Sequence, residues 1–413
     1  MIGHIDKKKA TDPNDRNEAV EWPTFSSDPA AYRPSHRSIL RPIEKSAAAS
    51  STIIVDLGAV VVPTNRSFND KLPGLELAAR LASHRGSFLI VLCSGTARSD
   101  EFPEPLRREL GGNLVLWDLP GPKESLLPQL ETSLHKLSTL WRANDVGIKR
   151  NIGLALAVRK GWEYVLFLDD DISTYEHGPT LDEQGLDSAL IAMQGEKSLR
   201  VIGWTAEDFS DNSVIGHARR LVHRDQGIFI SGGALLVRCD TDVPFFPAVY
   251  NEDWLFLIAT ATQATSNYRQ CLAHAGRVQQ RPNDPFSDAR AMSQEAGDIL
   301  GEGLMNLLED DGPGLWRTAT STKYWRRTVR RRAALIKEIV GALDADLARP
   351  SKLGARTAME AALRANRGIP PKLLTSYVKD WKADLDKWHK HLAVLAGLEV
   401  GSHVGQPGTA ARA

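Results

Sequence analysis

Trp162-Glu-Tyr-Val-Leu-Phe-Leu-Asp-Asp-Asp-Ile172 is the stretch that decides the fold. Its five apolar residues, Tyr164 to Leu168, suit a buried strand and are too few for an independent helix. A fully apolar run is typical of a central parallel strand that is covered on both faces. Three carboxylates follow at once, and in open α/β sheets ligands bind beyond the carboxyl ends of the strands. A solvated acidic turn is the alternative, although adjacent carboxylates that repel one another favour a nearby cation.

The composition is that of an ordinary globular protein. The 413 residues carry 51 basic and 51 acidic side chains, so the net charge gives no reason to expect a nucleic-acid partner. Three cysteines without metal-ligand spacing fit a reducing compartment. The first residues lack the apolar core of a signal peptide, and no stretch approaches transmembrane length. We therefore expect a cytoplasmic protein.

Strand-like and helix-like segments alternate along the first two thirds of the chain. Apolar runs at 52–62, 88–92 and 114–117 are typical of strands, and helical patterns separate them. This alternation predicts an α/β fold with a mostly parallel, doubly wound sheet. The predicted parts are a poorly ordered N-terminal arm at 1–50, the α/β domain at 51–285, a C-terminal helical region at 286–400 and a frayed tail at 401–413.

Two later segments carry candidate chemistry. The first, 227–238, is typical of a strand in which Gly232 and Gly233 let a backbone or a ligand come close, with a simple bulge as the alternative. The second, Asn251-Glu-Asp-Trp254, places two acids at the expected start of a helix. A helix N-terminus stabilises carboxylates, so ordinary capping explains one acid but hardly requires both.

The C-terminal region contains two notable helical patterns. One is an apolar stripe with alternating four-and-three spacing: Leu374, Val378, Trp381, Leu385, Trp388, Leu392 and Leu395. It predicts a helix over 374–395 that packs on its own domain, or that pairs two chains in a homodimer. The other is a basic amphipathic helix over 323–340, with Lys323, Arg326, Arg327, Arg330, Arg331 and Arg332. Such a helix lies on an anionic membrane surface as a peripheral contact, or presents a solvated face that pairs with acids.

The order of these motifs resembles that of a nucleotide-sugar glycosyltransferase with the GT-A fold, closest to the family 2 type. Four segments within roughly 52–280 carry the resemblance. They are Val62-Pro-Thr-Asn-Arg66, similar to the donor-base loop; Lys149-Arg-Asn-Ile-Gly-Leu-Ala155 before Asp169-Asp-Asp171, similar to the approach to the metal-binding Asp-x-Asp motif; Ile230-Ser-Gly-Gly-Ala-Leu-Leu-Val-Arg238; and Asn251-Glu-Asp-Trp254, which looks like the motif of the catalytic base in inverting members.

The resemblance implies an enzyme that moves a sugar from a nucleoside-diphosphate donor to an acceptor hydroxyl, with inversion. It implies Mg²⁺ or Mn²⁺ as Lewis acid and Asp253 as general base, with Glu252 binding the acceptor or serving as base instead. The implied metal ligands are Asp169, Asp171 and His274. The implied donor-binding residues are Pro63, Thr64, Asn65, Arg66, Lys149, Arg150, Asn151 and Asp170. The implied acceptor-binding residues are Gly232, Gly233 and Trp254.

Several readings stay open at this point. Cys93-Ser-Gly95 stands where such enzymes commonly carry acids that hold the nucleobase, so neither the base nor the sugar is implied. The identity of the acceptor is open too, and so is a mechanism that retains the configuration of the anomeric carbon. A sugar-phosphate nucleotidyltransferase would also use metal-binding acids, but it usually has a Gly-rich loop after its first strand. A glycoside hydrolase could use two carboxylates, but would not need the basic segment at Lys149. A non-catalytic nucleotide-sugar-binding scaffold is the alternative from another class, and the acids at both motif positions argue against it.

Overall fold

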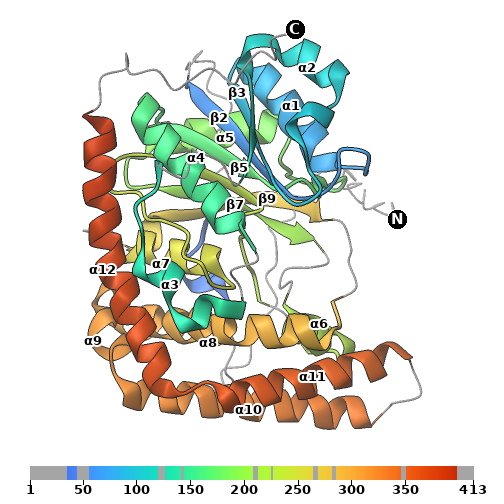
Figure 1. Cartoon of the computed structure of the whole chain (residues 1–413), viewed down its shortest axis with the longest axis vertical. Helices are drawn as coiled ribbons and strands as arrows, with labels where there is room; N and C mark the ends of the chain where they lie inside the picture. Colours follow the sequence, from blue (N-terminus) through green and yellow to red (C-terminus); the bar gives the residue numbers. More distant parts are fainter. Residues whose placement is uncertain are drawn as a thin grey trace, which may run out of the picture. The chain divides into compact units, whose positions relative to one another are not determined.

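Figure 1 shows the computed structural model, which describes residues 35–43, 55–119, 126–140, 144–207, 213–224, 227–263, 268–280, 285–345 and 350–397. The strands are β1 (Arg41–Pro42), β2 (Leu57–Thr64), β3 (Phe88–Cys93), β4 (Leu114–Asp118), β5 (Tyr164–Leu168), β6 (Ile172–Thr174), β7 (Val201–Glu207), β8 (Ala234–Arg238) and β9 (Leu272–Gln280). The helices are α1 (Pro73–Arg85), α2 (Glu104–Leu110), α3 (Glu131–Leu134), α4 (Val146–Lys160), α5 (Glu183–Gly195), α6 (Val214–Leu221), α7 (Glu252–Gln263), α8 (Asp288–Asp311), α9 (Trp316–Ala319), α10 (Thr322–Asp344), α11 (Pro350–Gly368) and α12 (Pro371–Ala396).

The strand β5 lies in the middle of one mixed sheet, whose order is β1-β9-β7-β8-β5-β2-β3-β4, with β6 paired to β9. Successive residues of a strand point to opposite faces. Val165 and Phe167 therefore enter a core shared with α4, α7, α8 and α12. Leu166 and Leu168 enter a second core, shared with α1 and α5. The predicted central strand, covered on both faces of an α/β sheet, is confirmed.

The strand β8 runs against its neighbours. It pairs antiparallel with both β5 and β7, whereas β2 pairs parallel with β3 and β5. Its amino end consequently lies at the edge where the parallel strands have their carboxyl ends. The strand predicted over 227–238 begins only at Ala234. The preceding backbone crosses this edge instead, where the carbonyl of Gly233 accepts a hydrogen bond of 2.9 Å from the N–H of Asp169.

The prediction of a poorly ordered arm at 1–50 is wrong for residues 35–43, which pack on the sheet. Arg41–Pro42 adds a short parallel strand beside β9. His36 is fully buried and packs edge-on against the stacked rings of Phe229 and Trp254, with centroid separations of 5.2 and 4.7 Å. Its Nδ1 accepts a hydrogen bond from the N–H of Ile230. The rest of the predicted arm and the predicted tail at 401–413 lie outside the described residues.

The helices after residue 285 share the core of the sheet. The stripe predicted along α12 is buried against α4, α3 and α10, and Figure 1 shows α12 running beside the α/β part. The stripe comprises Leu374, Val378, Trp381, Leu385, Trp388, Leu392 and Leu395, all at most 6% exposed. The prediction of a homodimer contact through this face is therefore wrong, because the chain's own core already covers the face.

The basic helix α10 also turns its apolar side inward. Trp325 and Ile336 are fully buried, so this side is not available to enter a lipid surface. Arg332 is buried as well and does not belong to the surface cluster in which the sequence placed it. The other members of that cluster, Lys323, Arg326, Arg327, Arg330 and Arg331, are exposed. Within the described residues, no helix combines the length and the apolarity needed to cross a bilayer.

Candidate functional site

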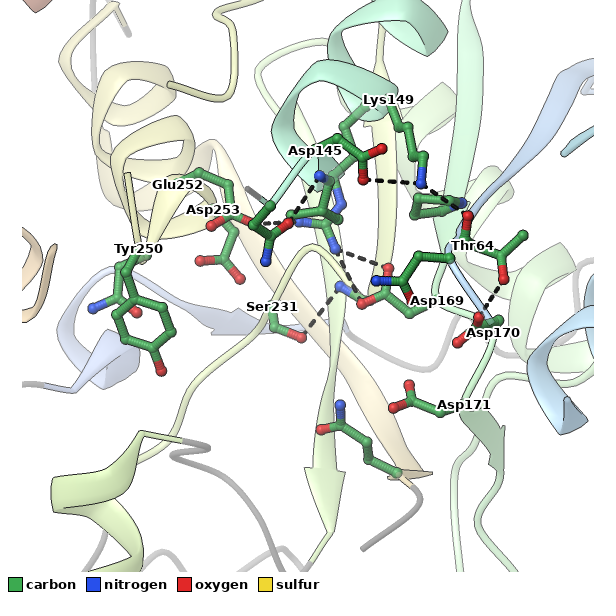
Figure 2. Close-up of a pocket in the computed structure, with 18 of the residues that line it drawn as sticks. Thr64, Asp145, Lys149, Asp169, Asp170, Asp171, Ser231, Tyr250, Glu252 and Asp253 are labelled. Atoms are coloured by element: carbon green, nitrogen blue, oxygen red, sulfur yellow. Dashed lines mark hydrogen bonds and ion pairs between the residues drawn. The ribbon is translucent and has the colours of Figure 1, made fainter. Parts of the chain in front are cut away.

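A polar cavity of about 320 Å³ opens at the carboxyl ends of β2 and β5 (Figure 2). The loops after these strands, the start of α4, the turn before β8 and the start of α7 form its walls. Six carboxylates line it: Asp145, Asp169, Asp170, Asp171, Glu252 and Asp253. Three cationic side chains line it: Arg66, Lys149 and Arg150. The fold thus brings most of the predicted donor-binding and catalytic residues into one cavity.

The buried guanidinium of Arg150 joins the two acidic motifs. It donates hydrogen bonds of 2.8 Å to Oε1 of Glu252 and 2.8 Å to Oδ1 of Asp169. The ring of Phe246 lies 5.6 Å away and packs against the cation. Gly232 leaves room for this arrangement, because a Cβ there would lie 2.4 Å from Cζ of Arg150. Arg150, predicted to bind the donor, therefore holds Asp169 and Glu252 in place.

The acidic triplet is held against the loop after β2. Thr64 Oγ1 donates to Asp170, and Arg66 donates to both Asp170 and Asp171. Burial raises the pKa of Asp170 to about 6 and also raises that of Asp171. Both pKa shifts mean that the buried site disfavours the charged form of these carboxylates. Asp170 thus fastens the loop, whereas Asp171 and Asp169 are the acids that remain for a ligand.

Gln280, at the end of β9, also reaches this group of acids. It lines the cavity and hydrogen-bonds the carboxylate of Asp171. Sequence reasoning missed this residue, because a single glutamine at the end of a strand carries no motif. Asn144, Ser231 and Tyr250 were missed for the same reason and line the cavity too.

The chemistry of these side chains fits Mg²⁺ or Mn²⁺. Carboxylate and amide oxygens are hard donors, and such ions are commonly held by one or two carboxylates together with substrate phosphates. Asp169, Asp171 and Gln280 offer donors of this kind. In the described part of the chain, no three His, Cys, Asp or Glu side chains gather as a metal cage. The residues therefore fit an ion whose coordination a phosphate ligand completes.

The prediction that His274 is a metal ligand is wrong. It lies in β9 opposite Gly203, and its Nε2 is 2.6 Å from the hydroxyl of Thr205. Gln280 is six residues further along the same strand, and six strand residues span about 20 Å. Burial lowers the pKa of His274 to about 4, so the ring is neutral near pH 7. His274 is a structural residue of the sheet.

Two predicted donor-binding side chains are occupied by contacts within the protein. Lys149 Nζ donates to the carbonyl of Thr64, the hydroxyl of Ser94 and the carboxylate of Asp145, at 2.6–2.9 Å. An ammonium has three N–H donors, so none is left for a phosphate. The amide of Asn151 likewise pairs with the backbone N–H and carbonyl of Phe246. Both residues position the cavity walls.

Both acids of the second motif line the cavity, and Asp253 is the more exposed of the two. Its carboxylate is half-buried and accepts hydrogen bonds of 2.9 Å from the N–H groups of Gly232 and Trp254. Glu252 is buried against Arg150. Burial raises the pKa of both acids. Of the predicted acceptor-binding residues, Gly233 and Trp254 line the cavity, while Gly232 supplies its N–H to Asp253.

No family model and no curated protein matches this sequence. Among solved structures, glucosyl-3-phosphoglycerate synthase from Mycobacterium tuberculosis, in complex with Mn²⁺, UDP and phosphoglyceric acid, is similar at 14% identity, with 55% of this chain and 72% of that chain covered and a TM-score of 0.34. A mannosyltransferase from Pyrobaculum calidifontis, in complex with GDP-Man and Mn²⁺, is similar at 14% identity, with 79% and 86% covered and a TM-score of 0.38. Mannosyl-3-phosphoglycerate synthase from Rubrobacter xylanophilus is similar at 13% identity, with 67% and 74% covered and a TM-score of 0.31.

The space left by Gly232 yields a direct test of the Arg150 arrangement. Gly232→Ala should lower the free energy of unfolding by about 1–3 kcal/mol, because the added methyl group overlaps a buried, ion-paired side chain. Gly341→Ala in α10 is the control: nothing lies within 4 Å of its added Cβ, so stability should stay level or rise by about 0.5–1 kcal/mol. Urea unfolding of the two variants measures the difference, and equal stabilities would contradict the packing described.

Proposed function

We propose that this protein is a glycosyltransferase that uses Mg²⁺ or Mn²⁺ to move a sugar from a nucleoside-diphosphate donor to an acceptor hydroxyl. One observation carries the proposal. A single cavity holds an acid triplet at a strand end and a second acid pair at a helix start, with Arg150 bridging the two (Figure 2). The first group suits a cation that binds a diphosphate, and the second suits a base for the acceptor.

The charge of the cavity supports the need for a metal ion. Its six carboxylates outnumber its three cationic side chains, and a diphosphate adds further negative charge. Two like charges 4 Å apart repel by about 4 kcal/mol at an effective dielectric constant of 20. Asp169 and Asp171, with Gln280 beside them, would hold the ion, which as a Lewis acid stabilises the charge of the leaving diphosphate. Arg66, half-exposed on the donor side, can contact the phosphates as well.

The position of Asp253 supports its role as general base in an inverting transfer. Two backbone N–H groups fix its carboxylate at the cavity wall, whereas Glu252 is engaged by Arg150. A base must come within hydrogen-bond reach of the acceptor hydroxyl as the new bond forms. Asp253 therefore takes the proton of the acceptor hydroxyl. Glu252 holds the guanidinium of Arg150 in its position near Asp253.

We also propose a peripheral contact between the exposed basic face of α10 and an anionic membrane. The face consists of Lys323, Arg326, Arg327, Arg330 and Arg331, which are exposed and take part in none of the ion pairs found among the described residues. Because the apolar side of α10 is buried in the protein, the contact is electrostatic and should weaken with salt.

Metal dependence is tested by calorimetry with UDP and GDP. We expect the wild-type protein to bind one of them at least tenfold more tightly with Mn²⁺ than without it. Asp171→Asn should lose this difference, because the amide keeps the shape of the carboxylate but not its charge. Asp118→Asn is the control, since Asp118 carries a carboxylate at the end of β4 that does not line the cavity. Equally tight binding with and without metal in the wild type would contradict the proposal.

The roles of the two motif acids are tested by turnover. Asp253→Asn should lose sugar transfer by about a hundred- to ten-thousand-fold while keeping donor and metal affinity, because the amide cannot accept the proton. Glu252→Gln still accepts a hydrogen bond from Arg150 but loses the charge of the ion pair, so it should lower turnover by less than Asp253→Asn does. A folded Asp253→Asn protein with turnover within about threefold of wild type refutes the assignment. An inactive Glu252→Gln protein would reverse the two roles.

The membrane contact is tested by co-sedimentation with phosphatidylserine vesicles at moderate salt. Replacing Arg326, Arg327, Arg330 and Arg331 by Gln should release the protein, since each basic group near such a surface contributes about 1 kcal/mol. The matched control replaces Lys379, Lys382, Lys387 and Lys390, exposed on α12, and should keep binding. Wild-type protein that stays in solution, or equal release in both variants, would rule out this surface.

A further inference from the structure

We propose that the C-terminal helices position the catalytic acids through a buried chain of contacts, Asn251–Asp298–Arg332, and that these three are positioning residues. The inference rests on the proposed function, because Asn251 directly precedes Glu252 and Asp253. It assigns a role in the reaction to α8 and α10, which contribute no side chain to the cavity lining.

The chain of contacts begins at an unusual backbone conformation. Asn251 has a φ of 63°, in the left-handed region that asparagine tolerates better than most non-glycine residues. Its carbonyl accepts a hydrogen bond of 3.1 Å from the N–H of Leu255, which is the first such bond of α7. The conformation of Asn251 therefore sets where the helix begins, and with it the directions of Glu252 and Asp253.

Asp298 of α8 holds the side chain of Asn251. The amide Nδ2 of Asn251 donates to Oδ1 of Asp298 at 3.0 Å. The other carboxylate oxygen, Oδ2, accepts from Arg332 of α10. Asn251, Asp298 and Arg332 are all buried. Because both oxygens of Asp298 are engaged, its orientation depends on Arg332 as much as on Asn251.

Arg332 is in turn fixed by further buried acids. It donates to Glu302, and at 3.3 Å to Glu295, both on α8. Glu295 also accepts a hydrogen bond of 2.8 Å from Asn366 of α11. A buried cation that is hydrogen-bonded on several sides has little freedom to move. The anchor of Asn251 is thus tied to three helices at once.

Two glycines of α8 bring this helix against the backbone of the motif. A Cβ at Gly297 would lie 2.0 Å from the carbonyl oxygen of Tyr250, and one at Gly301 would lie 3.3 Å from Nδ2 of Asn251. At Gly297 the helix therefore packs directly on the backbone of Tyr250, and at Gly301 it packs on the side chains of Asn251 and Trp254. A shift of α8 passes directly to Asp253, and a misplacement of about 1 Å is enough to lower a rate by about a hundredfold.

The test compares two buried asparagines of the same network. Asn251→Gly keeps the left-handed conformation without strain and removes the anchoring amide. We expect kcat to fall by about a hundredfold, with the dissociation constant of the donor and Mn²⁺ changed by less than twofold. Asn366→Ala removes a hydrogen bond to Glu295 that is not one of the links Asn251–Asp298–Arg332, and it should leave kcat within twofold. Equal losses in the two variants, or an unchanged kcat in Asn251→Gly, overturn the proposal.

A second variant separates positioning from direct contact with substrate. Asp298 does not line the cavity, and Asp298→Asn still offers an oxygen to Asn251 but weakens the link to Arg332. We expect a loss in kcat of about tenfold, again with donor affinity unchanged. An unchanged kcat in Asp298→Asn, beside a large loss in Asn251→Gly, would mean that Asn251 acts on the substrate itself and would overturn the proposal.

Amide hydrogen exchange gives a readout that does not need turnover. Peptides covering 247–258 should exchange at least fivefold faster in Asn251→Gly than in wild type, and at the wild-type rate in Asn366→Ala. If the wild-type protein transfers no sugar but this difference is seen, the proposed function fails and the positioning chain stands. Identical exchange in all three proteins overturns the chain.

Discussion

The guanidinium of Arg150 is the constraint on which the rest of the site depends. Taking a single cation out of water costs several kcal/mol unless partners surround it, and here Asp169 and Glu252 supply the partners at 2.8 Å each. Three elements, α4, β5 and α7, meet at this one side chain. None of them can move without leaving a charge buried alone. The acidic triplet after β5 and the acid pair at the start of α7 are therefore held at one fixed separation.

The antiparallel direction of strand β8 explains how backbone groups reach the cavity that contains Arg150. In an all-parallel sheet, only the carboxyl ends of strands and the loops that follow them would lie at this edge. Because β8 is antiparallel to β5, its leading residues arrive there too. The carbonyl of Gly233 then meets Asp169, and the N–H of Gly232 meets Asp253. Backbone groups thus aim both acids without adding charge to an already acidic cavity.

Local sequence patterns predicted much of the fold and only part of the site. The apolar run before Asp169 predicted the central strand and its acidic edge, the alternation of segments predicted the sheet, and Asn251-Glu-Asp-Trp254 separately predicted two acids at the start of a helix. Lys149, Asn151 and His274 have partners within the protein that the sequence did not predict, because a polar side chain facing its own protein looks the same in sequence as one facing a ligand. Asp298 and Arg332 were not predicted as partners of the site, because contacts between distant segments carry no local pattern.

The packing of α8 against Tyr250 and Asn251 has a consequence for how the protein matures during synthesis. The motif acids are translated early, but the residues that anchor them belong to helices translated much later. Domains fold as units while the chain emerges, so a nascent chain that ends before Arg332 has every acid of the cavity but lacks the anchor that we propose for Asn251. Translation must therefore pass through α10 before the chain holds the whole proposed chain of contacts from Arg332 to Asn251.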